Sequence, residues 1–198
     1  MHPQKDTRSA LHRLLTRAFG LLAGLRGMDV QGLERVPRDG PVIVAANHVS
    51  LFDPPVTHVA VSRVRYARYL GKEELFRIPP LGALLKNCGV IPLDRGRGDM
   101  AALRVSLGVL SGGGCLVVYP EGTRSRDGRP GRPKAGVGLL AKRTGAVVVP
   151  VRLRNTERFW MRGPWSVRFG TPLRYEEGED RGGAQRFAER VMDEVWKL

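Results

Sequence analysis

No run of apolar residues in this chain approaches the roughly 18 to 20 that a membrane-spanning helix needs. The apolar stretch 19–25, which follows a basic N-terminus, is short and has no clean small-residue cleavage site, so we do not expect a signal peptide. Cysteine is scarce: Cys88 and Cys115 lie in apolar surroundings, without a C-x-x-C spacing or a nearby histidine. We expect both to be small core residues in a reducing compartment, and we predict no metal site.

Several motifs of well-known enzyme classes are also missing. The sequence has no Gly-x-x-x-x-Gly-Lys loop and no G-x-G-x-x-G, so nucleotide and dinucleotide binding have no support. It has no G-x-S-x-G elbow, so Ser50 is not a convincing nucleophile. A general base in this chain would therefore act on a hydroxyl that belongs to a substrate.

Positive charge, by contrast, is abundant. The chain carries 33 Lys and Arg residues against 19 Asp and Glu residues, which gives a formal net charge of +14. Three classes of partner follow from this balance: nucleic acid, an anionic membrane surface and acidic soluble substrates. Nucleic acid is not expected, because the sequence lacks a ladder of basic and aromatic residues, zinc-finger spacing and an RNP-like string.

The length of 198 residues suits one domain with a sizeable core. From about residue 29, apolar strand-like segments alternate with segments of helical periodicity, which implies crossovers between parallel strands. We predict an α/β fold, in which residues 29–198 form a single domain with a largely parallel or mixed central sheet flanked by helices. Strands are expected at 41–46, 64–71, 90–94, 115–120, 146–153 and, at an edge of the sheet, 166–173. Helices are expected at 74–89 (broken by Pro79 and Pro80), 99–110 (with Asp99 as a cap), 133–145 (closed by Gly145) and 183–198.

Residues 1–28 are expected to form an N-terminal amphipathic helical appendage. On a helical wheel the leucines at 11, 14, 15, 22 and 25 gather with Ala18 on one side, and Arg13 and Arg17 lie opposite. This pattern is typical of a helix packed on its own domain, and also of an interfacial helix whose leucines enter the acyl boundary of an anionic leaflet. Both interpretations can hold together. We predict that membrane association depends mainly on residues 8–26.

The stretch AANHVSLFDPP, residues 45–55, places a histidine and an aspartate five positions apart at the end of a predicted strand. In one regular helix these positions would be rotated by roughly 140°, so His48 and Asp53 could meet only if a turn follows the strand. A histidine oriented by an aspartate is the core of a general base. An alternative stays open, because Asp53 followed by Pro54 is also a normal helix N-cap.

Polar residues follow two further predicted strands. Asp94 and Arg95 end one, and the segment from Glu121 to Ser125 ends another, where Gly122, Thr123 and Arg124 offer an open backbone, a hydroxyl and a guanidinium. Ligands of open parallel sheets bind beyond the carboxyl ends of the strands, so these groups are expected to converge on one rim. Arginine can hold a phosphate bidentately, and Lys72 and Arg95 could add further positive charge.

Four ordered blocks in residues 47–150 resemble the glycerolipid acyltransferase family. NHVSLFD (47–53) is similar to the family's N-H-x-S-x-x-D, GVIPLDR (89–95) to its second block, YPEGTRS (119–125) to F-P-E-G-T-R-S, and VVVPV (147–151) to its fourth. GKEELFRIPPLG (71–82) also resembles the segment between the first two blocks. Tyr119 for the usual phenylalanine is a minor departure, and Pro92 in the second block is a less usual one that bears on how the acceptor fits.

The resemblance implies that a fatty acyl group passes from an acyl thioester, acyl-CoA or acyl-acyl carrier protein, to the sn-2 hydroxyl of lysophosphatidate. It further implies that His48 is the base, that Asp53 orients it, and that no metal or organic cofactor takes part. The phosphate and glycerol of the acceptor would contact Lys72, Arg95, Glu121, Gly122, Thr123 and Arg124, with Asn47, Ser50 and Pro150 in support. We expect a peripheral or monotopic protein on the cytoplasmic face of an anionic membrane.

Two alternatives stay open at this stage. The acceptor can be glycerol-3-phosphate or another lysolipid, because the apolar residues that would measure acyl and acceptor length are dispersed along the sequence. The chain can also be a non-catalytic basic module that binds anionic lipid. The second alternative is disfavoured, since binding alone has no use for a histidine oriented by an aspartate.

Overall fold

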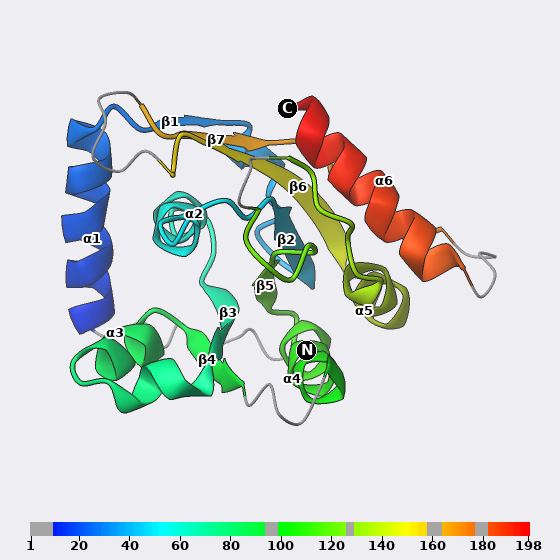
Figure 1. The fold of residues 1–198 in the computed structure, drawn as a ribbon, viewed down its shortest axis with the longest axis horizontal. Coiled ribbons are helices and arrows are strands. Elements are labelled where there is room, and N and C mark those ends of the chain that lie inside the picture. The colour runs from blue at the N-terminus through cyan, green and yellow to red at the C-terminus, as the bar shows by residue number, and fades with distance from the viewer. Residues whose placement is uncertain (1–9, 94–98, 126–128, 158–163, 177–181) are drawn as a thin grey trace.

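The computed structural model describes residues 10–93, 99–125, 129–157, 164–176 and 182–198. A seven-stranded sheet runs through its centre in the order β1-β7-β6-β2-β5-β3-β4 (Figure 1). The strands are β1 (Asp29–Gln31), β2 (Val42–Ala46), β3 (Ala67–Lys72), β4 (Val90–Leu93), β5 (Cys115–Val118), β6 (Val147–Arg154) and β7 (Ser166–Phe169). All neighbouring strands pair in parallel except β6 and β7, so the sheet is mixed. The predicted α/β class and the mixed, mostly parallel sheet are confirmed.

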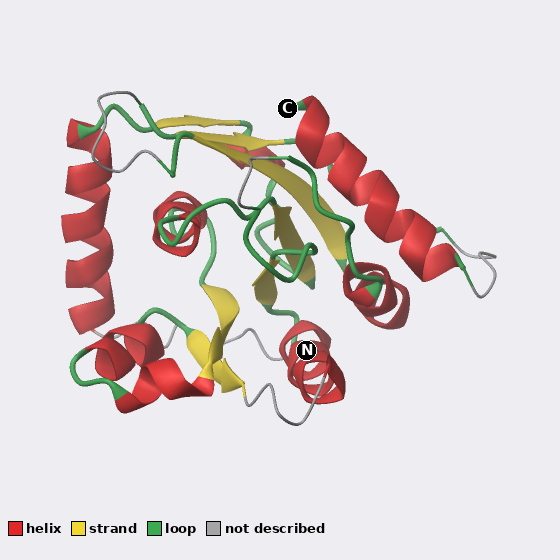
Figure 2. Cartoon of the chain, in the orientation of Figure 1, coloured by secondary structure: helices red, strands yellow, loops and turns green. Residues whose placement is uncertain are grey.

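Six α-helices and two short 3₁₀ helices connect the described strands (Figure 2). The α-helices are α1 (Ala10–Leu25), α2 (Asp53–Val61), α3 (Leu81–Asn87), α4 (Asp99–Ser111), α5 (Gly136–Thr144) and α6 (Gly183–Lys197), and the 3₁₀ helices are η1 (Leu33–Arg35) and η2 (Glu73–Arg77). The predicted break in 74–89 is present: η2 ends before the Pro79–Pro80 pair and α3 begins after it. Gly145 follows α5 with φ 64°, the left-handed conformation that commonly closes a helix. The predicted cap at Asp99 concerns a side chain outside the described part of the structure.

β7 does not lie at an edge, which corrects the prediction for 166–173. The three-residue strand β1 pairs with the outer side of β7, from Asp29 with Ser166 to Gln31 with Arg168. A three-residue strand carries too little alternation to be recognised in a sequence, so both β1 and its position were missed. At the opposite end of the sheet, β3 pairs with β5 only at Ala67 and Arg68, and from Tyr69 onward it pairs with β4.

The core consists of two apolar layers, one on each face of the sheet, and β2 contributes to both. Val42, Val44 and Ala46 face the layer that contains Val56 and Ala60 of α2. Ile43 and Ala45 face the layer that α4, α5 and α6 cover. Because every residue of β2 is fully buried, this strand is an apolar run without polar alternation, as expected for a central parallel strand. Its carboxyl end is therefore held in place from both sides.

Helix α1 packs on the domain, but not through its leucine side. His12, Thr16, Phe19 and Ala23 face inward: Phe19 stacks on Trp165 with centroids 6.0 Å apart, and Thr16 Oγ1 lies 3.1 Å from His58 Nε2. The leucines of the predicted apolar stripe point mostly outward, with Leu14 63% and Leu25 79% exposed. The helix thus carries three faces: a packed one, a leucine one and a basic one with Arg13 and Arg17. The boundary at residue 28 stays a prediction.

Within the described residues, no helix has the length and apolar character required to cross a membrane.

Candidate active site

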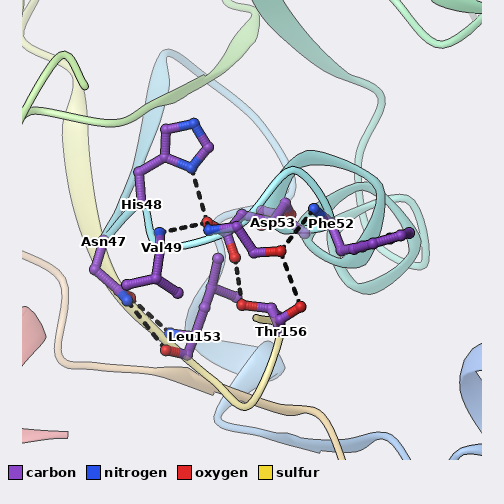
Figure 3. A network of polar contacts seen from close by, with 9 residues as sticks. Asn47, His48, Val49, Phe52, Asp53, Leu153 and Thr156 are labelled. Carbon is purple, nitrogen blue, oxygen red and sulfur yellow. Dashed lines mark hydrogen bonds and ion pairs between the residues drawn. The ribbon is translucent and has the colours of Figure 1, made fainter. Parts of the chain in front are cut away.

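The loop between β2 and α2 brings His48 and Asp53 together. The chain turns after β2, so the two side chains can meet, which one regular helix would not allow. The Nδ1 atom of His48 lies 2.7 Å from Oδ2 of Asp53, and the ring of His48 extends away from the hydrogen-bonded loop (Figure 3). An ionised carboxylate can only accept, so Nδ1 carries the proton and Nε2 keeps a lone pair. Because the side chain of His48 is 19% exposed and that of Asp53 is fully buried, only the histidine is open to a substrate.

The N-cap interpretation of Asp53 is wrong. Phe52 is the N-cap residue of α2 and Asp53 is the first helical residue. Within the described residues, the hydrogen bonds of the Asp53 carboxylate are with the preceding loop and with Thr156, not with backbone amides of the helix. Its Oδ2 instead accepts from the backbone N–H groups of Val49 and Ser50, each at 2.7 Å, and its Oδ1 accepts from Oγ1 of Thr156 at 2.5 Å. Together with His48, four donors surround this buried carboxylate. Such a set supplies the buried carboxylate with hydrogen bonds in place of water and holds it in one position.

Asn47 and Ser50 hold the loop after β2 in place through hydrogen bonds. The side-chain amide of Asn47 donates to the carbonyl of Leu153 at 3.0 Å and accepts from its N–H at 2.7 Å, which ties the end of β2 to β6 (Figure 3). The hydroxyl of Ser50 donates to the carbonyl of Thr156 at 2.9 Å and is buried, so it is unsuited to attack a substrate. Pro150 belongs to the sheet rather than to the loop: it pairs with Ala45, and its carbonyl accepts from Gly170.

The loop after β5 lies directly against His48. The rings of Tyr119 and His48 stack with centroids 4.3 Å apart, and the N–H of Ser125 donates to the carbonyl of His48 at 2.8 Å. Gly122 has φ +74°, and the aliphatic part of Lys134 approaches so closely that a β-carbon there would lie 3.2 Å from it. Two of the three predicted strand ends therefore converge. The third, which carries Arg95, lies outside the described residues.

A cavity of about 370 Å³ opens beside this loop. Its lining consists of Glu121, Thr123, Ser125, Arg129, Pro130, Gly131 and Arg132. Glu121 and Thr123 were predicted site residues, whereas Arg129 and Arg132 follow the third motif block and were not predicted. Arg124 is exposed and is not part of the lining, and Lys72 lies at the end of β3, where that strand has left β5 for β4. The structure thus adds two guanidinium groups to the cavity that motif spacing had not indicated.

Glu121 is the buried acid of the cavity. Its side chain is only 7% exposed, and neither carboxyl oxygen has a hydrogen bond of ordinary geometry in the described structure. Burial raises the pKa of Glu121 to about 7, partly opposed by Arg152 and by the backbone amide of Gly131, and nearby Asp53 raises it further. Near neutral pH this carboxyl can therefore either donate or accept a hydrogen bond.

Arg152 is a half-buried basic residue that the sequence did not indicate. It lies near the end of β6, its guanidinium stacks 3.5 Å above the ring of Trp196, and its Nε and Nη1 atoms have no hydrogen-bond partner among the described residues. Burial lowers its pKa to about 10, with Arg154 acting in the same direction and Glu121 in the opposite one. A group of basic residues that includes Arg152, Arg129 and Arg132 thus accompanies Glu121.

No group of three or more His, Cys, Asp or Glu side chains that could hold a metal ion occurs in the part of the chain that the structure describes.

The chain is similar to known 1-acyl-sn-glycerol-3-phosphate acyltransferases. The chain is 34% identical over 138 residues to a chloroplastic 1-acyl-sn-glycerol-3-phosphate acyltransferase of Brassica napus, covering 68% of this chain and 39% of that protein. It is 33% identical over 143 residues to a 1-acyl-sn-glycerol-3-phosphate acyltransferase of Borreliella burgdorferi, covering 71% and 56%. This chain thus spans about two fifths of the plant relative and just over half of the bacterial one.

The fold has a solved counterpart. The crystal structure of the 1-acyl-sn-glycerophosphate acyltransferase of Thermotoga maritima matches with a TM-score of 0.76 and 27% identity, covering all of this chain and 83% of that one. Residues 27–154, well over half of the sequence, match the model of the family described as Acyltransferase. The chain belongs to the acyltransferase family.

Proposed function

We propose that this protein transfers a fatty acyl chain from an acyl thioester, either acyl-CoA or acyl-acyl carrier protein, to the sn-2 hydroxyl of lysophosphatidate, which yields phosphatidate. The observation that carries the proposal is the pair of His48 and Asp53, with Nδ1 and Oδ2 2.7 Å apart and only the histidine open to a substrate. The names of the relatives support the choice of acceptor.

The geometry suggests a direct transfer. Nε2 of His48 accepts the proton of the sn-2 hydroxyl while the hydroxyl oxygen attacks the thioester carbonyl, and buried Asp53 stabilises the imidazolium that forms. When the tetrahedral intermediate collapses, the carbon–sulfur bond breaks and the imidazolium returns the proton to the leaving thiolate. The products are phosphatidate and a free thiol. This scheme needs neither a protein nucleophile nor a metal or organic cofactor.

The cavity beside the loop after β5 suits the phosphate and glycerol of the acceptor. We propose that Arg129 and Arg132 bind the phosphate, joined by exposed Arg124, because guanidinium groups can hold a phosphate bidentately. Glu121, with a pKa of about 7, is suited to a hydrogen bond with a glycerol oxygen. The contributions of Lys72 and Arg95 stay predictions, as do those of Gly122 and Thr123.

The leucine face of α1 supports a membrane location, where the lipid acceptor resides. Its outward leucines adjoin a face with Arg13 and Arg17, an arrangement typical of helices that lie in the interface of an anionic leaflet. We propose that the protein binds the cytoplasmic leaflet peripherally or monotopically through this face.

The test is thiol release from acyl-CoA and acyl-acyl carrier protein, measured with and without lysophosphatidate for the wild type and for His48→Ala. We expect release that depends on lysophosphatidate and falls by about 10² or more in the variant, the typical contribution of a positioned general base. Glycerol-3-phosphate and a second lysolipid serve as competing acceptors, and faster turnover of either would assign a different acceptor. Lipid binding without thiol release from any donor would contradict an enzymatic function.

A further inference from the structure

Thr156 belongs to none of the motif blocks, yet it contacts the centre of the candidate site. It is fully buried, lies two residues after β6, and donates from Oγ1 to Oδ1 of Asp53 at 2.5 Å (Figure 3). We propose that Thr156 is a positioning residue, which fixes the plane of the Asp53 carboxylate and through it the orientation of His48. The inference rests on the proposed acyl transfer for its kinetic consequences, but its geometric part can be tested without a substrate.

The two oxygens of Asp53 have unequal sets of donors. Oδ2 accepts from three groups: Nδ1 of His48 and the backbone amides of Val49 and Ser50. For Oδ1, the hydroxyl of Thr156 is the donor that the described residues supply. The terminal torsion of an aspartate has a broad energy minimum, and rotation about the Cβ–Cγ bond moves both oxygens. The three donors at Oδ2 restrain this rotation from one side only, and the donor at Oδ1 restrains it from the other, which narrows the range of carboxylate orientations.

The backbone of Thr156 explains why its hydroxyl stays in place. The carbonyl of Thr156 accepts from the hydroxyl of Ser50 at 2.9 Å, and three positions earlier Leu153 makes both hydrogen bonds to Asn47. The segment 153–156, at the end of β6 and just beyond it, is therefore attached to the 47–53 loop at both ends. Since the attachment points are buried, the hydroxyl of Thr156 has little freedom to turn elsewhere.

The hydroxyl, rather than the volume of the side chain, is the group that matters. A hydrogen bond to a buried charged group contributes more than one between neutral groups, and removing its donor leaves an oxygen that water cannot reach. Valine has almost the shape of threonine but replaces the hydroxyl by a methyl group. Serine keeps the hydroxyl and loses only the methyl. The two substitutions therefore separate the hydrogen bond from the packing.

The kinetic test compares Thr156→Val and Thr156→Ser with a matched control, Thr144→Val. The hydroxyl of Thr144 is likewise a hydrogen-bond donor, but its acceptor is the backbone carbonyl of Leu140, and it lies at the end of α5, away from the site. We expect kcat of Thr156→Val to fall about 10-fold to 100-fold, with KM for lysophosphatidate and for the thioester unchanged. Thr156→Ser should stay within about threefold of the wild type, and Thr144→Val should keep the wild-type kcat.

A double-mutant cycle tests whether Thr156 acts through Asp53. In an Asp53→Asn background, Thr156→Val should cost less than about twofold, because the carboxylate that it positions is already gone. Full additivity would overturn the proposal, and so would a Thr156→Ser variant as slow as Thr156→Val. If Thr156→Val does not fold, Thr156→Cys replaces it, since a thiol is only a weak donor.

The substrate-free test follows the Nδ1 proton of His48 by proton NMR, with the resonance assigned by its loss in His48→Ala. We expect a downfield resonance in the wild type, in Thr156→Ser and in Thr144→Val, and its loss or broadening in Thr156→Val. An unchanged resonance in a folded Thr156→Val variant would refute the positioning role even if the enzyme transfers acyl groups. A wild type that shows the resonance but releases no thiol would instead contradict the proposed function.

Discussion

The outward leucines of α1 allow a sharp test of membrane binding, because they can be changed without touching the core. Leu14, Leu21 and Leu25 are 63%, 68% and 79% exposed, whereas the face that packs on the domain is formed by other residues. We predict that the triple variant Leu14→Ser, Leu21→Ser and Leu25→Ser keeps the melting temperature of the wild type but binds lipid vesicles much more weakly.

The magnitude follows from the exposed fractions. Complete transfer of a leucine side chain from water to an apolar medium contributes about 1.5–3 kcal/mol. The three exposed fractions amount to roughly two whole leucines, so full insertion would contribute about 3–6 kcal/mol. A helix in the interface inserts only one face to a shallow depth, and half of this value, about 1.5–3 kcal/mol, corresponds to a roughly 10-fold to 150-fold loss in partitioning.

Sedimentation with vesicles of a zwitterionic lipid, alone or mixed with an anionic one, measures this loss. The control is Met100→Ser, since Met100 is 66% exposed but lies on α4, which covers the other face of the sheet. A second variant, Arg13→Gln with Arg17→Gln, should weaken binding only to the anionic vesicles and only at low salt. Binding by the triple leucine variant as strong as that of Met100→Ser would refute the assignment of this face to lipid.

Two predictions concern stability. Burial raises the pKa of Glu121 in the folded protein from its ordinary 4.5 to about 7, so its contribution to stability is complete below about pH 4.5 and is lost as the pH rises through 7. Because the cavity that Glu121 lines opens to solvent, part of this cost is screened. We therefore expect urea unfolding to show that Glu121→Gln gains about 1–2 kcal/mol of stability at pH 8 relative to its effect at pH 4.5; an equal effect at both pH values would contradict this. Asn47→Ala should destabilise the fold by about 2–4 kcal/mol, since two buried hydrogen bonds to Leu153 are lost. The control Asn87→Ala removes an exposed hydrogen bond to the carbonyl of Ala83 and should cost less than about 1 kcal/mol in the same measurement.

Local signals made much of the fold predictable. A run such as 41–46 has no polar face that could meet water, which indicates a central strand. Gly145 and the Pro79–Pro80 pair each mark the end of a helix through backbone geometry alone. The packed face of α1 was not predictable in this way. It is formed by His12, Thr16, Phe19 and Ala23, a mixture without hydrophobic contrast, whereas the uniform leucine stripe faces outward. Hydrophobic periodicity shows that a helix has an apolar face but not what covers that face.

The residues of the site differ in the same way: local signals in the sequence predict some of them and not others. His48 and Asp53 were predictable because a single short loop carries both, so their meeting needs only a turn. Thr156 and Arg152 reach the site because β6 pairs with β2 in the sheet, more than a hundred residues apart in sequence. That pairing is a property of the whole topology, and no spacing in the sequence reports it. The sequence shows that Arg129 and Arg132 are charged, but only the cavity in the structure shows which of the many arginines lie together.

The start of α2 shows how Asp53 can orient His48 without leaving the helix uncapped. The first backbone N–H groups of an α-helix have no partner within the helix, and an aspartate at this position would usually serve them. Here the N–H of Phe52 donates to Oγ of Ser50 and that of Asp53 to the carbonyl of Ser50, while Pro54 and Pro55 have no N–H at all. No unpaired amide in the first turn is left to compete for the carboxylate. The sequence Ser-x-x-Asp-Pro-Pro therefore both begins the helix and leaves both oxygens of Asp53 available to the loop, to His48 and to Thr156.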